Sequence, residues 1–336
     1  MNAPTKKSRA LKRWPIRAAN TAPGAARWPL IVLLATLPSL SLATMHKTRI
    51  TTETPMIDHD AAEEIVATQR DQYGRIRVPA LINGKGPFSL IFDTGANNSA
   101  VSSGVANELG AALNEQPPMI MHGVTGSVRV PSIRVDSIAV GGFSTRPSRL
   151  PIVLDALDGA DGFLSTASLP GQRIVLDLQR NLLVLRAGRS GRDGPGFVKL
   201  RVELSRSGML MFNAVVDGVR VKSILDTGAQ ATIGNMAMRD AITHQRSVGN
   251  GPDEVIGASS ARHLGHTYLL SPFQIGSLWV VGARVSYGDM PIFGQLDMTT
   301  GPAMLIGMDV LGQFDAIIFD YADKAMLLRP RRRVTL

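Results

Sequence analysis

The feature that most constrains this chain is a short motif that occurs twice. Residues 90–96 are Leu-Ile-Phe-Asp-Thr-Gly-Ala, and residues 223–229 are Ser-Ile-Leu-Asp-Thr-Gly-Ala. Each copy is an apolar run, typical of a buried strand, that leads into a glycine-containing turn. Asp93 and Asp226 therefore stand at the ends of rigid elements, which is the support that a catalytic group needs. One such turn is common, but two in one chain indicate a duplication.

The flanks of the two motifs repeat as well. Asn83-Gly84 and Asp217-Gly218 precede them at nearly equal distances, and both dipeptides are typical of tight β-hairpins. Downstream, Phe163-Leu164-Ser165 in the first half corresponds to Leu305-Ile306-Gly307 in the second. The repeat is about 130 residues long, which is the size of a domain and too long for a solenoid unit.

Short strand-like runs and frequent turns predict an all-β fold, made of two duplicated β-barrel lobes with a few short helices and a cleft between them. We expect the first lobe at residues 63–187 and the second at 197–330. Residues 188–196, rich in glycine and charge, are predicted to link them, and 331–336 form a basic tail. Pro79 is expected to interrupt a strand and make part of it an edge or a bulge.

The N-terminus has the features of an export signal. A basic segment precedes an apolar stretch of about fourteen residues, shorter than the roughly 20 that a membrane-crossing helix needs. Ser41 and Ala43 supply the small residues that a signal peptidase recognises. We expect residues 1–43 to be a signal peptide cut near Ala43 or, if uncut, a membrane tether, followed by a linker at 44–62. Either case places the body outside the cytoplasm, in a periplasm.

The net charge of +9 belongs to the ends of the chain. Eleven basic residues lie within 1–28 and 329–333, where there is no acidic residue, so the body is close to neutral. A nucleic-acid partner is therefore not predicted. The chain has no cysteine, which excludes disulfides, thiolate nucleophiles and cysteine-ligated zinc.

The doubled motif resembles the signature of the retropepsin-like aspartic proteases, in a single-chain, two-lobed bacterial form related in plan to pepsin. In that family an apolar residue and Asp-Thr-Gly-(Ala/Ser/Thr) are followed by two apolar residues and a glycine. The resemblance covers roughly residues 64–330. The second half has the glycine at Gly307, whereas the first has Ser165. A serine at this position bears on how tightly the backbone packs behind the Asp93 turn.

The resemblance implies two acid-protease lobes that each contribute one catalytic carboxylate, Asp93 and Asp226, to an aspartic-type endopeptidase. In such a pair, two adjacent carboxylates share one proton and activate a water molecule. The expected partner is a peptide or protein substrate, no cofactor is implied, and a monomer would hold both carboxylates. The residues expected to support the catalytic turns are Thr94, Gly95, Ala96, Thr227, Gly228 and Ala229.

Within these turns, the resemblance implies that the threonine hydroxyls cross-link the two loops and that the glycines let the backbone approach the carboxylates. Ala96 and Ala229 are of the retroviral type, because pepsins usually carry a hydroxyl there that favours the charged carboxylate. We therefore expect a less acidic pH optimum than that of pepsin.

Two glycine-containing segments are candidates for flaps that cover a substrate. Their residues are His122, Gly123, Val124, Thr125 and Gly126 in the first half, and Ile256, Gly257 and Ala258 in the second. Neither has the tyrosine typical of pepsin flaps. His263 and His266 have no third ligand at a recognisable spacing, so we interpret them as surface histidines and predict no metal site.

Two alternatives remain at the level of the sequence. The two aspartates could simply cap backbone amides in turns, although the repetition argues against this. The same fold could also serve as a non-catalytic periplasmic module that binds extended peptides between its lobes. Against this second alternative, a binding cleft does not need two facing carboxylates, whose burial costs stability.

Overall fold

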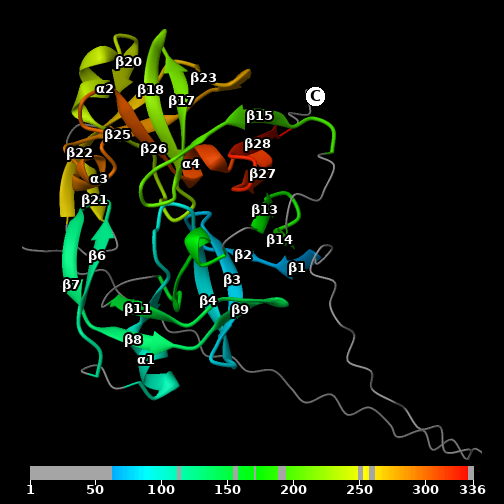
Figure 1. Ribbon diagram of the computed structural model, residues 1–336. Helices are drawn as coiled ribbons and strands as arrows, with labels where there is room; N and C mark the ends of the chain where they lie inside the picture. Colours follow the sequence, from blue (N-terminus) through cyan, green and yellow to red (C-terminus); the bar gives the residue numbers. More distant parts are fainter. Residues whose placement is uncertain are drawn as a thin grey trace, which may run out of the picture. The chain divides into compact units, whose positions relative to one another are not determined.

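The computed structural model describes residues 63–111, 115–153, 158–169, 172–187, 194–248, 253–256 and 262–331. The predicted signal segment, the 44–62 linker and nearly all of the basic tail lie outside these residues, as does most of the interdomain linker. Within them the fold is all-β, with four short α-helices and one 3₁₀ turn, as predicted (Figure 1). None of the helices in this part of the chain is long and apolar enough to cross a bilayer.

The first half forms a nine-stranded sheet in the order β10-β9-β3-β4-β12-β5-β11-β8, with β2 paired to β3. Its strands are β2 (Gln69–Arg70), β3 (Ile76–Ile82), β4 (Lys85–Asp93), β5 (Ala100–Ser102), β8 (Ser132–Val135), β9 (Ile138–Val140), β10 (Phe143–Ser144), β11 (Ser148–Val153) and β12 (Gly162–Ser165). Helix α1 (Ser103–Leu109) follows β5, and the 3₁₀ turn Thr166–Ser168 follows β12. Strand β4 runs parallel to β12, and β5 runs antiparallel to β12 on its other side.

The second half forms an eleven-stranded sheet in the order β20-β22-β25-β19-β26-β18-β17-β23-β24, with β16 and β21 paired at its sides. Its strands are β16 (Glu203–Leu204), β17 (Leu210–Val216), β18 (Val219–Leu225), β19 (Ile233–Gly234), β20 (Gln245–Ser247), β21 (Asp253–Ile256), β22 (Arg262–Leu270), β23 (Phe273–Ile275), β24 (Leu278–Val280), β25 (Arg284–Tyr287) and β26 (Ala303–Ile306). Its helices are α2 (Met236–Ala241), α3 (Pro291–Gln295) and α4 (Met308–Leu311).

The two halves share one internal plan, which confirms the duplication. In the second half β18 runs parallel to β26, and β19 runs antiparallel to β26, as β4, β12 and β5 do in the first. The hairpins before the two motifs also match. Asn83 and Asp217 both have positive φ, as do the glycines that follow them, which is the backbone of the tight turn that these dipeptides favour.

A third sheet combines strands from both halves in the order β1-β14-β13-β27-β28-β15. Its strands are β1 (Glu63–Ala67), β13 (Gln172–Asp177), β14 (Leu182–Ala187), β15 (Val198–Arg201), β27 (Phe314–Asp320) and β28 (Ala325–Pro330). The halves meet where β13 pairs antiparallel with β27, and a buried ion pair joins Arg173 to Asp320 across that seam at 2.9 Å. The lobe boundaries predicted above stay predictions, because this sheet belongs to both halves.

The prediction for Pro79 is confirmed, because one side of the strand is unpaired at this residue and an irregularity lies next to it. Pro79 lies inside β3, which is an interior strand between β9 and β4. Strand β3 pairs with β2 at residues 76–77 and with β9 at residues 81–82, so Pro79 falls between these two partners, where no ladder needs its missing N–H. The irregularity expected near it does occur, since the register with β4 shifts between Ala80 and Ile82.

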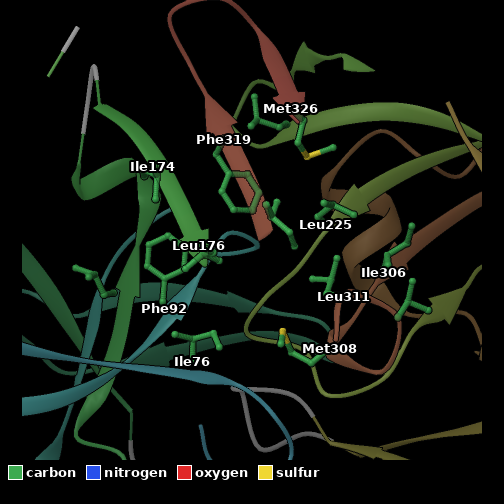
Figure 2. Packing of buried hydrophobic residues seen from close by; sticks show 14 of the residues in the cluster. Ile76, Phe92, Ile174, Leu176, Leu225, Ile306, Met308, Leu311, Phe319 and Met326 are labelled. Carbon is green, nitrogen blue, oxygen red and sulfur yellow. The ribbon is translucent and has the colours of Figure 1, made fainter. Parts of the chain in front are cut away.

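The core beneath the two motifs is continuous between the halves. Phe92 and Leu225, the residues before Asp93 and Asp226, are buried and belong to one apolar cluster. Figure 2 shows their side chains together with Phe319 of β27 and Leu176 of β13, so the strands that carry the carboxylates rest on the shared sheet. Packing of this density holds backbone positions closely, which fixes the two turns relative to each other.

Candidate active site

Two turns at equivalent places in the two halves bring Asp93 and Asp226 together. Asp93 ends β4, and Asp226 follows the last residue of β18. The two carboxyl groups are close enough for each to shift the pKa of the other. A Cβ built on Gly95 would lie 2.4 Å from Cγ of Asp226, and one built on Gly228 would lie 2.5 Å from Cγ of Asp93. Each glycine backbone therefore packs directly on the carboxyl group of the other half, and a side chain cannot fit there.

The threonines of the two motifs tie the turns together through exchanged hydrogen bonds. The Thr94 hydroxyl donates to the carbonyl of Leu225 at 2.7 Å and accepts the N–H of Thr227 at 3.1 Å. The Thr227 hydroxyl donates to the carbonyl of Phe92 at 2.7 Å and accepts the N–H of Thr94 at 3.1 Å. Both threonines are buried. This is the cross-link that the sequence resemblance implied, and its two arms have the same distances.

The hydrogen bonds from backbone amides differ between the two carboxylates. Oδ1 of Asp226 accepts the N–H groups of Gly228 at 2.9 Å and Ala229 at 3.0 Å, whereas Oδ1 of Asp93 accepts the N–H of Gly95 at 2.8 Å. Amide donors favour the charged form of a carboxylate. Two such bonds on one oxygen favour the charged form of Asp226.

The pKa values of both aspartates lie above their ordinary range, and the two shifts differ. Burial, then the charge of Asp226, raises the pKa of Asp93 well above its usual value. Burial also raises the pKa of Asp226, but the amides of Gly228 and Ala229 oppose the shift. The two carboxyls are coupled, so they titrate as a pair and share one proton above the ordinary range of an aspartate.

The backbone behind the two turns packs alike despite the serine at position 165. In the second half the Gly307 amide donates to Oγ1 of Thr232 at 3.1 Å, and in the first the Ser165 amide donates to Oγ of Ser99 at 3.0 Å. A Cβ on Gly307 would meet the Ala231 backbone at 2.6 Å, which excludes a side chain there. Ser165 is fully buried, so the first half has made room for its side chain.

The first candidate flap is a β-hairpin that crosses to the other half. Strands β6 (Met119–Gly123) and β7 (Gly126–Val130) form it, with Val124 and Thr125 at the turn. Val124 packs on an apolar cluster of the second half, and its carbonyl accepts the Ile292 amide at 3.3 Å. Nε2 of His263 lies 3.1 Å from the carbonyl oxygen of Thr125. Figure 1 shows this hairpin beside α3 and β21.

The second candidate flap is described only in part. Strand β21 pairs with β22 up to Ile256 and Arg262, so a hairpin stands here, whereas Gly257 and Ala258 lie outside the described residues. Neither α3 nor the contact between His263 and the first hairpin was predicted from the sequence. Both depend on segments that are far apart in the chain, and the interpretation of His263 as a surface residue overlooked its place at the tip of that hairpin.

A pocket of about 370 Å³ adjoins the Asp226 turn. Its wall includes Met308 and Asp309, whose amides bond to the carbonyls of Ala229 and Gln230 directly after the motif. Tyr73 of the first half and Arg284 of the second also line it, so both halves shape it. Among the described residues, no group of three or more histidine, aspartate or glutamate side chains is placed to hold a metal ion.

A model of the aspartyl protease family matches residues 78–166 of the chain. The matched segment runs from within β3 to the 3₁₀ turn and contains the Asp93 turn and Ser165, and Asp226 lies beyond it. No curated protein matches the chain. The similarity to the aspartyl protease family model thus covers the segment around the Asp93 turn.

Proposed function

We propose that this protein is an aspartic endopeptidase in which Asp93 and Asp226 activate one water molecule for attack on a peptide bond. The observation that carries the proposal is the exchange of contacts between the turns, in which each half buttresses the carboxylate of the other. A pair of turn aspartates that only capped their own amides would not need this exchange. The finer assignment to a two-lobed, retropepsin-like form is part of the same proposal.

We assign the two roles from the amide hydrogen bonds, which favour the charged form of Asp226. The charged Asp226 takes a proton from water as the water oxygen attacks the peptide carbonyl carbon, and the protonated Asp93 gives its proton to the carbonyl oxygen. In the tetrahedral intermediate, Asp226 then returns its proton to the amide nitrogen while Asp93 removes one from a hydroxyl. The C–N bond breaks, the acid and amine products leave, and the pair regains its starting protonation.

The surroundings of the pair suit an extended peptide. The β6–β7 hairpin reaches the other half at α3 and β22, and a chain bound under it would be shielded from water, which strengthens the electrostatics of the pair. The N-terminal sequence supports export to a periplasm with or without a retained membrane tether, and one chain supplies both carboxylates, so we propose a monomer.

The test uses the chain from residue 44 onward and an unstructured protein substrate, assayed across pH. Asp93→Asn and Asp226→Asn should each lower kcat at least about a hundredfold, because each removes one arm of the proton transfer. The matched controls are Asp136→Asn and Asp240→Asn, which change exposed carboxylates in the same two halves and should keep full activity.

Three outcomes would contradict parts of the proposal. Equal activity of all variants would exclude these carboxylates from catalysis. Half of the wild-type activity in each Asn variant would mean that two sites form between chains. A wild-type protein that binds peptides tightly but cleaves none, at any pH, would favour the non-catalytic peptide-binding module.

A further inference from the structure

The two catalytic turns are held from behind by different groups. In the second half, the carbonyl of Ala229 accepts the backbone amide of Met308 at 2.9 Å. In the first half, the equivalent carbonyl of Ala96 accepts the hydroxyl of Ser165 at 2.6 Å. A side-chain donor thus does in one half what a backbone donor does in the other. This difference follows from the substitution of serine for glycine, which breaks the symmetry of the duplication.

We propose that Ser165 is a positioning residue for Asp93, whose hydroxyl holds the Ala96 carbonyl and thereby the turn that presents Asp93 to the substrate. The inference rests on the proposed function. Ser165 does not touch the reacting atoms, so its effect passes through the Ala96 peptide, three residues after the aspartate.

Ser165 is itself held firmly enough to act in this way. Its side chain is fully buried, its amide donates to Ser99 at 3.0 Å, and its hydroxyl accepts the amide of Ala167 at 3.1 Å. It lies on β12, where it is the register partner of Asp93 in the adjacent parallel strand. The hydroxyl therefore starts from a fixed backbone next to the strand that it supports, as a positioning group must.

The position of the Ala96 peptide matters for the charge on Asp93. The Ala96 amide is one of the groups that lower the pKa of Asp93 against the effects of burial and of Asp226. The Ala96 carbonyl and the Ala96 amide belong to the peptide groups on either side of its Cα, so when the carbonyl loses its donor, residue 96 is free to rotate and this amide contact weakens. The pKa of Asp93 should then rise further, and Asp93 should become a weaker proton donor.

The test compares Ser165→Ala and Ser165→Gly with wild type under the assay above. We expect kcat about tenfold lower than in wild type, because one buried hydrogen bond to a carbonyl is lost. KM should stay within about twofold of the wild-type value. The alkaline limb of the kcat profile should move to higher pH, because the more basic Asp93 keeps its proton longer. Ser165→Thr, which retains the hydroxyl, should recover activity relative to Ser165→Ala.

The matched control is Ser132→Ala in the same half. Ser132 is also fully buried, and its hydroxyl donates to the carbonyl of Pro117 at 2.9 Å, away from the two turns. This variant should lower the melting temperature by a comparable amount while leaving kcat and its pH profile unchanged. The proposal is overturned if Ser165→Gly, which restores the glycine of the second half, retains wild-type kcat and pH profile, or if kcat falls equally in the control.

A second measurement separates this proposal from the proposed function. Carbon-13 labelling of the aspartate carboxyls allows the titration of Asp93 to be followed by NMR without any substrate. A higher titration midpoint in Ser165→Ala than in wild type supports the positioning role even if no peptide is cleaved. An unchanged midpoint contradicts it.

Discussion

The cross-link between the two turns yields a prediction that can be worked out quantitatively. Thr94→Val keeps the shape of the side chain and removes its hydroxyl. Two buried backbone groups then lose their partner, the carbonyl of Leu225 at 2.7 Å and the N–H of Thr227 at 3.1 Å. Thr227→Val does the same to the carbonyl of Phe92 and the N–H of Thr94.

The size of the effect follows from the number of groups left unpaired. Each buried polar group without a partner costs about 1–3 kcal/mol, so each variant, which leaves two such groups, should lower the free energy of unfolding by roughly 2–6 kcal/mol. Because the distances in the two arms are equal, the two variants should agree within about 0.5 kcal/mol, which is the usual error of such comparisons.

Urea unfolding followed by circular dichroism measures these values. Thr94→Ser and Thr227→Ser are the controls, since they retain the hydroxyl and remove only a methyl group, at a cost of roughly 1 kcal/mol. The reasoning is refuted if the valine variants are no less stable than the serine variants. It is also refuted if one valine variant is strongly destabilised and the other is not, because the exchange would then not be symmetric.

Three further predictions concern the carboxylates and the seam between the halves. In the cleavage assay, Gly228→Ala should abolish activity, because its Cβ would lie 2.5 Å from the Asp93 carboxyl. Gly301→Ala, at a site with open space, should keep activity. Because folding raises the pKa of Asp93, this carboxyl stabilises the fold below its ordinary pKa of about 4, and the stabilisation is lost as pH rises through the folded pKa. Asp93→Asn should therefore raise the melting temperature at pH 8, and raise it less at pH 4. Arg173→Met should cost about 3–5 kcal/mol in urea unfolding because Asp320 is left buried without its cation, and adding Asp320→Leu should recover part of that loss.

Much of the fold could be predicted because its determinants are local. The Asn-Gly and Asp-Gly turns need positive φ, and the apolar runs before the two aspartates need burial, so both are visible in a few adjacent residues. The duplication made the inference stronger, since the same local pattern occurs at the same distance in each half. The carboxylates could be placed together for the same reason.

The features that could not be predicted depend on contacts between distant segments. The contact of Val124 and Thr125 with α3 and His263 joins residues more than a hundred positions apart, and nothing near either segment indicates it. The position of Pro79 within an interior strand depends on where β2 and β9 end along β3. The substitution at position 165 was visible, but the acceptor of its hydroxyl could be identified only from coordinates.

The central claim is that Asp93 and Asp226 of one chain share a single proton. Its most direct test is an NMR titration of the carbon-13-labelled carboxyls, in wild type and in Asp226→Asn. We predict that in wild type Asp93 keeps its proton well above the ordinary aspartate pKa of about 4. Its titration midpoint should fall when the charge of Asp226 is removed. Two carboxyls that titrate independently near pH 4, each unaffected by replacement of the other, would contradict the account.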